Sequence, residues 1–276
     1  MKNLAVALCV VCLMATLISA CGISANYGHD HLHRPINSNE SKQEDGLVRP
    51  LKPLASLMNS NKRSYSWVYD TQVFTIELAL EKRLNDDYED LKKNFDLMKV
   101  LKDDDWSDYL QRLPGDTIVA SIARQLTVMA ELNNFNRRQL AELAITFVQS
   151  LPYDTDKAKE LPLFINKAAL CLYGTPYQVL YQGMDICVGK SILGFALLQE
   201  LEFGSALIMM PNNKHAAFAI SCESGRGMRD SLDYYYIEST DRMAIGAFPL
   251  IMDTKKVDQL RIALAKKGDI YYRKEL

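Results

Sequence analysis

The stretch from Asp185 to Glu238 constrains the fold most, because its apolar pattern changes once, from helical to strand spacing. Apolar residues recur at helical spacing at Ile192, Leu193, Ala196, Leu197 and Leu201. Three short strand-like runs follow, at Ala206 to Met210, His215 to Ile220 and Tyr234 to Glu238. A long apolar helix followed by strands predicts an α+β fold.

Short connections are predicted between these runs, so neighbouring strands are expected to pair antiparallel. Pro211 to Lys214 predicts a turn, and the charged, glycine-containing segment Glu223 to Asp230 predicts a hairpin loop. A last helix is predicted from about Lys255 to Lys266.

The preceding part of the chain is predicted to be mainly helical, after one hairpin. Apolar residues alternate on both sides of Asp70-Thr71-Gln72, at Trp67, Tyr69, Phe74, Ile76, Leu78 and Leu80. Helical spacing recurs in three segments, Leu84 to Met98, Ile118 to Met129 and Leu140 to Val148, the last ending before Pro152.

The charge run Asp103-Asp104-Asp105 raises the question of a calcium site. It lacks the glycine and the spaced ligands of an EF-hand loop. We therefore expect a solvated turn whose last carboxylate caps the following segment.

Cys187 and His215 are the candidates for thiol chemistry. His215 is the only histidine outside a polar stretch near the N-terminus, so it is the only candidate partner for a catalytic cysteine. Asp185 is placed to cap the helix, with Cys187 as its second residue. A helix N-terminus and a neighbouring imidazolium both favour the thiolate form of a cysteine. His215 on an adjacent strand could take the thiol proton and return it to a leaving amine.

A carboxylate one strand further would fix the tautomer of that imidazole. Glu238 lies in the right chain order, and Asp233 and Asp241 are its competitors. The backbone N–H of Cys187 could help stabilise an oxyanion, and Gln178 or Gln182 would be an alternative donor. The tyrosines Tyr234 to Tyr236 are interpreted as sheet packing rather than a recognition surface.

The N-terminal segment predicts export. Lys2 precedes an almost unbroken apolar run, Leu4 to Leu17, which is too short to span a bilayer. Ile18-Ser19-Ala20-Cys21 matches the lipobox of bacterial lipoproteins, so residues 1–20 are expected to be a signal peptide and Cys21 to be acylated. Ordinary secretory cleavage or a short membrane anchor are the alternatives. Gly22, where aspartate would favour the inner membrane, implies sorting to the outer membrane, with the protein facing the periplasm.

Residues 21–62 are rich in small and polar residues and are expected to tether the domain to the lipid. His29, His31 and His33 lie in this tether, where a transition metal would bind weakly and without defined geometry. We therefore expect no metal site, and the thiol chemistry needs no cofactor.

The remaining cysteines are odd in number. Cys9 and Cys12 leave with the signal peptide, and Cys21 is modified, so three thiols remain, at Cys171, Cys187 and Cys222. Either Cys171 and Cys222 pair and leave Cys187 free, or all three are reduced.

Composition argues against a nucleic-acid partner. The formal charge is −2 and apolar residues make up 48% of the chain, with no basic stripe of interleaved aromatics. This balance is that of an ordinary globular protein.

Around these residues the chain resembles the transglutaminase-like, papain-like fold superfamily in its bacterial exported form, from about Leu143 to Pro249. In that family a cysteine opens the core helix in a context similar to G-D-C-x-D-K-S, a histidine opens the next strand, and an acidic residue ends the third. The residues in those places are Cys187 with Lys190 and Ser191, His215, and Glu238 with Ser239 and Thr240.

The chain departs from that pattern at three places. Asp185 stands two residues before the cysteine, where the family has its aspartate immediately before it. Val188-Gly189 replaces an acidic pair, and Glu238 stands where aspartate is commoner.

The resemblance implies a papain-like core with a mainly helical N-terminal part. We expect four regions: the signal peptide (1–20), the acylated cysteine and tether (21–62), a hairpin and helical region (63–140) and a transglutaminase-like domain (141–276). The implied function is that of an envelope lipoprotein with a cysteine amidohydrolase or peptidase site, which cleaves peptide or protein amides through a Cys187 thioester. Transamidation by the same site, or an inactive module that binds a peptide or an envelope assembly partner, are the alternatives.

Overall fold

The computed structural model describes residues 60–162, 165–210, 214–223, 233–249 and 261–271. Within these ranges it contains eight α-helices, one short 3₁₀ helix and two antiparallel sheets, which confirms the α+β class. The strands are β1 (Ser60–Tyr69), β2 (Gln72–Glu81), β3 (Ser205–Met210), β4 (His215–Ser221), β5 (Tyr234–Ile237) and β6 (Arg261–Lys266). The helices are α1 (Lys82–Lys92), α2 (Leu97–Asp103), α3 (Ile118–Leu132), α4 (Arg137–Ser150), α5 (Thr155–Glu160), α6 (Lys167–Leu172), α7 (Pro176–Gln182) and α8 (Cys187–Glu200). The expected signal peptide and Cys21 fall outside the described residues, as does most of the tether.

The predicted N-terminal hairpin is confirmed. β1 and β2 pair with Tyr69 opposite Gln72, and Asp70 and Thr71 turn the chain with φ of 46° and 65°. Positive φ at both turn residues gives the twist that two antiparallel strands need. The inward face of the hairpin packs on α4, where the rings of Trp67 and Phe147 lie 5.2 Å apart.

The helix predicted from Leu84 to Met98 is wrong in its extent. The structure has two helices there, α1 and α2, separated by residues 93–96. The side chain of Asp96 accepts a hydrogen bond from the N–H of Met98 and so begins α2. An N-cap aspartate competes with helix continuation, and here the cap wins. The acidic run begins as the end of α2, at Asp103, and turns at Asp104. The Asp105 carboxylate accepts from the N–H of Ser107, the first residue of the 3₁₀ helix Ser107–Leu110, although the N-cap residue is Trp106.

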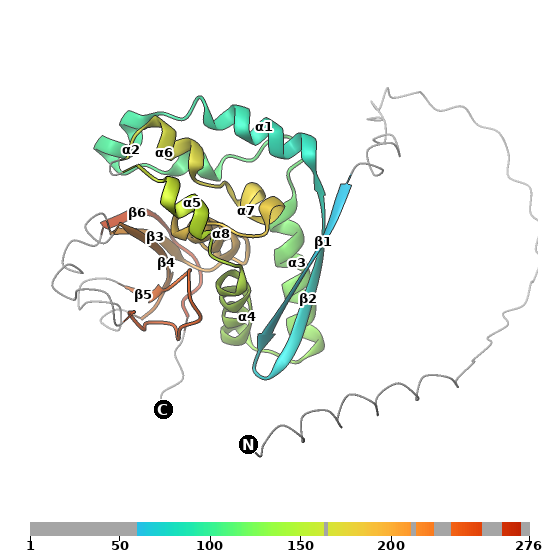
Figure 1. Ribbon diagram of the computed structural model, residues 1–276. Coiled ribbons are helices and arrows are strands. Elements are labelled where there is room, and N and C mark those ends of the chain that lie inside the picture. Colours follow the sequence, from blue (N-terminus) through green and yellow to red (C-terminus); the bar gives the residue numbers. More distant parts are fainter. Residues whose placement is uncertain (1–59, 163–164, 211–213, 224–232, 250–260, 272–276) are drawn as a thin grey trace, which may run out of the picture. The chain divides into compact units, whose positions relative to one another are not determined.

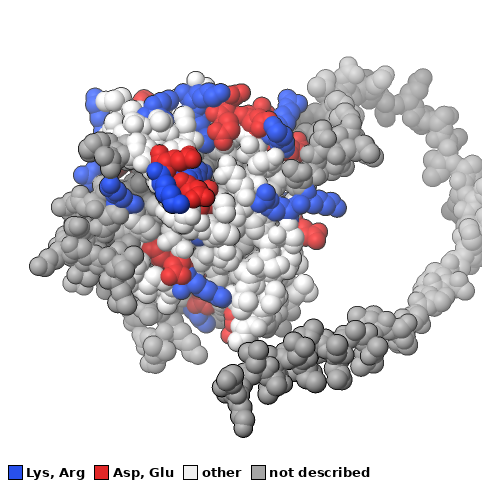
Figure 2. Space-filling view, in the orientation of Figure 1, with Lys and Arg blue, Asp and Glu red and all other residues white. Residues whose placement is uncertain are grey.

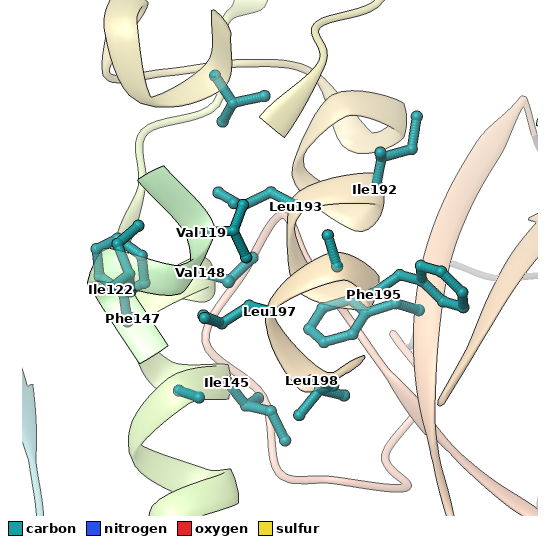
Figure 3. Packing of buried hydrophobic residues seen from close by; sticks show 14 of the residues in the cluster. Val119, Ile122, Ile145, Phe147, Val148, Ile192, Leu193, Phe195, Leu197 and Leu198 are labelled. Atoms are coloured by element: carbon teal, nitrogen blue, oxygen red, sulfur yellow. The ribbon is translucent and has the colours of Figure 1, made fainter. Parts of the chain in front are cut away.

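Helix α8 is the centre of the core. It is apolar on almost every side, and all residues from Cys187 to Leu198 are buried. A helix that is apolar all round must be covered on all sides. α3, α4 and α7 cover one side of α8 and strands β3 and β4 the other (Figure 1). Figure 3 shows Leu193 and Leu197 of α8 lying toward Val119 of α3 and Val148 of α4.

The four-stranded sheet has the order β5-β4-β3-β6, with every neighbouring pair antiparallel. The predicted antiparallel strands are therefore present, whereas the loop expected between Glu223 and Asp230 lies mostly outside the described residues. One face of β4, including Phe218, packs with α8 in the main core. Ala217 and Ala219 lie on the other face of β4, in a small second cluster that also includes Tyr236 of β5.

The last predicted helix is wrong where it is described. Arg261–Lys266 forms β6, which pairs antiparallel with β3, and residues 255–260 lie outside the described part. Alanine, leucine and lysine favour helices locally, but the backbone of β3 offers a ladder of hydrogen bonds, and this tertiary pairing outweighs a weak local preference.

The described surface carries charges of both signs. Figure 2 shows lysine and arginine interspersed with aspartate and glutamate on the displayed face. Within the described ranges, no helix has the length and apolar character required to cross a bilayer.

Candidate active site

Cys187 is the first residue of α8 and is 5% exposed. The prediction that Asp185 caps this helix is wrong. The N-cap residue is Ile186, whose side chain makes no capping hydrogen bond, and Asp185 accepts instead from the N–H of Ile186 itself. The first N–H groups of α8 therefore receive no hydrogen bond from an N-cap side chain. They lie at the N-terminal end of the helix, where Cys187 is the first residue.

Asp185 instead fixes the segment that leads into α8. Its backbone N–H donates to Pro152, and its carbonyl accepts from Asp154. Its carboxylate is fully buried and pairs with the ammonium of Lys157 at 2.8 Å. Burial raises the pKa of Asp185, and the charge of Lys157 opposes that rise.

Two glycines make room for this carboxylate. A Cβ built on Gly174 would lie 2.0 Å from Oδ2 of Asp185, and one built on Gly189 would lie 2.2 Å from the same atom. Gly189 stands within the first turn of α8, so a residue larger than glycine is excluded there for a steric reason. A side chain there would occupy the place of Asp185.

His215 begins β4, and Glu238 directly follows β5. Nε2 of His215 lies 2.9 Å from Oε2 of Glu238. Phe218 pairs with Ile237, so one further step of this register would set Glu238 opposite Ala217 and make His215 its diagonal neighbour. Diagonal pairs are farther apart than direct ones, and a longer side chain spans them better. This geometry suits glutamate better than the shorter aspartate at this position.

Three further donors hold the Glu238 carboxylate. The Tyr236 hydroxyl donates to Oε2 at 2.6 Å, and the N–H and hydroxyl of Thr240 donate to Oε1 at 2.9 and 2.7 Å. Burial by itself raises the pKa of Glu238, but the bond to His215, the histidine charge and these donors lower it to about 2. The carboxylate is therefore ionised at neutral pH.

His215 is correspondingly biased toward its protonated form. Burial lowers its pKa, but hydrogen bonds to Cys187 and Glu238 outweigh burial and raise the pKa of His215 to about 9. Since Nε2 faces Glu238, Nδ1 is the nitrogen that faces the thiol. An imidazolium between a sulfur and a carboxylate is the arrangement that stabilises a thiolate.

Ser239 and Gln149 support this arrangement and were not assigned a role from the sequence. The Ser239 hydroxyl contacts the carbonyl of Cys187 at 3.4 Å and the hydroxyl of Ser191 at 3.0 Å, which ties the end of β5 to the start of α8. Nε2 of Gln149 donates to the carbonyls of Glu238 and Met243, each at 3.0 Å. A polar residue on the buried face of α4 was the available signal for Gln149.

The alternative residues are placed elsewhere. Asp233 and Asp241 are exposed. Gln178 takes part in the capping box of α7 and donates to Glu89, and Gln182 is exposed. The described cysteines Cys171, Cys187 and Cys222 are all free thiols. Among the described residues, no group of three or more histidine, cysteine or acidic side chains is arranged to hold a metal ion.

Comparison with known proteins gives one weak likeness. No family model matches the chain, and no curated protein matches it. A solved structure described as the crystal structure of a TGase aligns with 75% of this chain at 12% identity and a TM-score of 0.36. The alignment covers 50% of that structure's chain.

Proposed function

We propose that the chain is a transglutaminase-like cysteine amidohydrolase or peptidase that cleaves peptide or protein amide bonds. The observation that carries the proposal is the chain of contacts from Cys187 through His215 to the buried carboxylate of Glu238. Nucleophile, base and orienting acid stand in the order that covalent thiol catalysis requires.

The chemistry follows from these positions. The Cys187 thiolate attacks the amide carbonyl, and N–H groups at the start of α8 stabilise the oxyanion. His215 gives its proton to the leaving amine, which leaves a thioester on Cys187. Water then attacks the thioester while neutral His215 takes its proton, the C–S bond breaks, and a carboxylic acid, the Cys187 thiolate and protonated His215 result. If an amine attacks in place of water, the product is a new amide.

An acyl-trapping experiment tests this proposal. The full chain is treated with p-nitrophenyl acetate, and acetylation is located by mass spectrometry of peptides. We expect a burst of nitrophenol with acetyl on Cys187, lost in Cys187→Ala and retained in the control Cys171→Ser. Added primary amines that speed deacylation would identify an acyl transferase. Acetylation at Cys171 with none at Cys187 would contradict the proposal.

The second candidate is an inactive module that binds a peptide. The low exposure of Cys187, 5%, favours it, because a nucleophile must be reached by its substrate. Failure of acyl trapping, together with saturable binding of peptides, would support this function instead.

We further propose that the mature protein is anchored in the cell envelope by acyl chains on Cys21, at the outer membrane and facing the periplasm. The lipobox-like sequence supports this proposal. Two or more acyl chains give stable anchoring. Metabolic labelling with a palmitate analogue tests it: the label should enter the wild-type chain and not Cys21→Ala, and equal labelling of both would contradict it.

A further inference from the structure

Lys190 is a buried cation beside the candidate nucleophile. It lies on α8 three residues after Cys187, and residues three apart on a helix are surface neighbours. Its side chain is fully buried, and its ammonium donates to the carbonyl of Leu151 at 2.6 Å. Within the described part of the chain, no carboxylate oxygen lies within 4.0 Å of this ammonium.

An uncompensated charge is costly in a protein interior. The other buried charges around the site have close partners: Lys157 with Asp185 at 2.8 Å, and His215 with Glu238 at 2.9 Å. When His215 is protonated, Lys190 is the cation left over. The remaining group able to carry a negative charge beside it is the sulfur of Cys187.

We propose that Lys190 is the counter-charge of the Cys187 thiolate, a positioning residue that holds the nucleophile in its anionic form. This inference rests on the proposed function, since it concerns the same sulfur. Lys190 would be the second cation of the site. It lies on helix α8, whereas His215 lies on strand β4.

The groups around Lys190 agree with this assignment. Four groups attract this ammonium, in decreasing order of effect on its pKa: Glu238 after β5, Asp185 before the helix, Asp241 after β5, and Cys187 on its own helix. Asp185 and Glu238 already pair with other cations, and Asp241 is exposed, where solvent screens its charge. Burial lowers the pKa of Lys190 to about 8 against the attraction of these anions, so the ammonium is retained at neutral pH.

The pH dependence of thiol alkylation tests the proposal. The full chain is treated with iodoacetamide from about pH 4 to 10, a range that includes the ordinary pKa values of histidine and cysteine. The rate of alkylation is followed at the peptide that contains Cys187. Lys190→Met removes the charge and keeps an apolar side chain of similar length. We expect its pH midpoint to rise by about one unit, which lowers the rate roughly tenfold below that midpoint.

Lys92→Met is the matched control. Lys92 is also buried and donates to backbone carbonyls, those of Cys171 and Tyr173, but its ammonium has a carboxylate partner, Glu89 at 3.4 Å. We expect its profile to match the wild type. A Lys190→Met midpoint equal to that of the wild type would overturn the inference while leaving the proposed function intact. A wild-type profile without a plateau below the ordinary thiol range would instead defeat the proposed function, and this inference with it.

A reciprocal measurement does not depend on whether Lys190→Met folds. The pKa of Lys190 is followed by NMR of its ε-carbon before and after the thiols are carbamidomethylated. Alkylation removes the anion, so the pKa of Lys190 should fall. An unchanged pKa of Lys190 would show that the sulfur is not its counter-charge.

Discussion

The carboxylate of Glu238 lies 2.9 Å from Nε2 of His215, across 23 residues of chain and two neighbouring strands. This single contact fixes the ring so that its other nitrogen faces Cys187. It depends on the pairing of β4 with β5 and on the donors of Tyr236 and Thr240, which hold the Glu238 carboxylate in place through further hydrogen bonds. The orientation of the base is thus a property of the sheet.

Replacing Glu238 with glutamine should reduce acylation of Cys187 by about 10²- to 10⁴-fold, because the amide no longer stabilises the imidazolium or its tautomer. The acetylation burst with p-nitrophenyl acetate measures this. Asp241→Asn, which neutralises an exposed carboxylate nearby, is the control and should stay within about twofold of the wild type. Equal loss in both variants would show that local charge, rather than the bond to His215, matters.

Stability should depend on pH in two windows. The pKa of Glu238 is lowered from 4.5 to about 2, so its contribution is present above pH 4.5 and is lost as the pH falls toward 2. The pKa of His215 is raised from 6.5 to about 9, so its contribution is present below pH 6.5 and is lost as the pH rises through 9. The two windows report one ion pair, and each is worth a few kcal/mol at most, at about 1.36 kcal/mol per unit.

Urea unfolding from about pH 2 to 10 measures both windows. In Glu238→Gln the acid loss should shrink, since the other carboxylates still titrate, and the alkaline loss should shrink because His215 has lost one partner. A variant whose stability falls in acid as steeply as that of the wild type would contradict the assignment of the low pKa to Glu238.

Substituting Ser239 with alanine should destabilise the fold by about 1–3 kcal/mol, because the hydroxyl is buried and bonded to Ser191 and to the carbonyl of Cys187. Acylation should slow as well, since this contact aligns the start of α8 with the end of β5. Denaturant unfolding and the acetylation burst measure the two effects. Ser64→Ala on the exposed face of β1 is the control, and a Ser239→Ala variant as stable as Ser64→Ala would refute the role.

Glycine to alanine inside a helix ordinarily stabilises it by up to about 1 kcal/mol. At Gly194 we expect the opposite sign. A Cβ there would lie 2.7–2.8 Å from the ring of Phe218, and overpacking of this kind costs about 1–3 kcal/mol. Thermal or urea unfolding gives the sign directly. A more stable Gly194→Ala variant would show that α8 and β4 are less closely packed than described. Cys187 on α8 and His215 on β4 would then also lie farther apart.

Local periodicity was sufficient to predict the elements that carry the site. The apolar run of α8, the short apolar run of β3 and the strand-like pattern of β4 and β5 each show in a few consecutive residues, and so does the hairpin β1–β2. The strand β6 could not be predicted in this way, because its stability comes from β3, which precedes it by about fifty residues, while its own alanine, leucine and lysine favour a helix.

Contacts within the site were harder to anticipate than its members. Cys187, His215 and Glu238 were chosen by residue type and chain order, and the structure brings them together. The roles of Ser239, Gln149 and Lys190 depend on contacts between segments far apart in the sequence, which no periodicity reports. The position of Asp185 was misassigned because a capping aspartate and a buried, lysine-paired aspartate look the same in sequence.

The rate of iodoacetamide alkylation at Cys187 against pH, in the full chain and in His215→Ala, tests the central claim most directly. An ion pair between Cys187 and His215 predicts a rate plateau reached well below pH 8 in the wild type and lost in the variant. A slow rate that rises only near the ordinary thiol range, at about pH 8.5, and that is the same in both proteins would contradict the account.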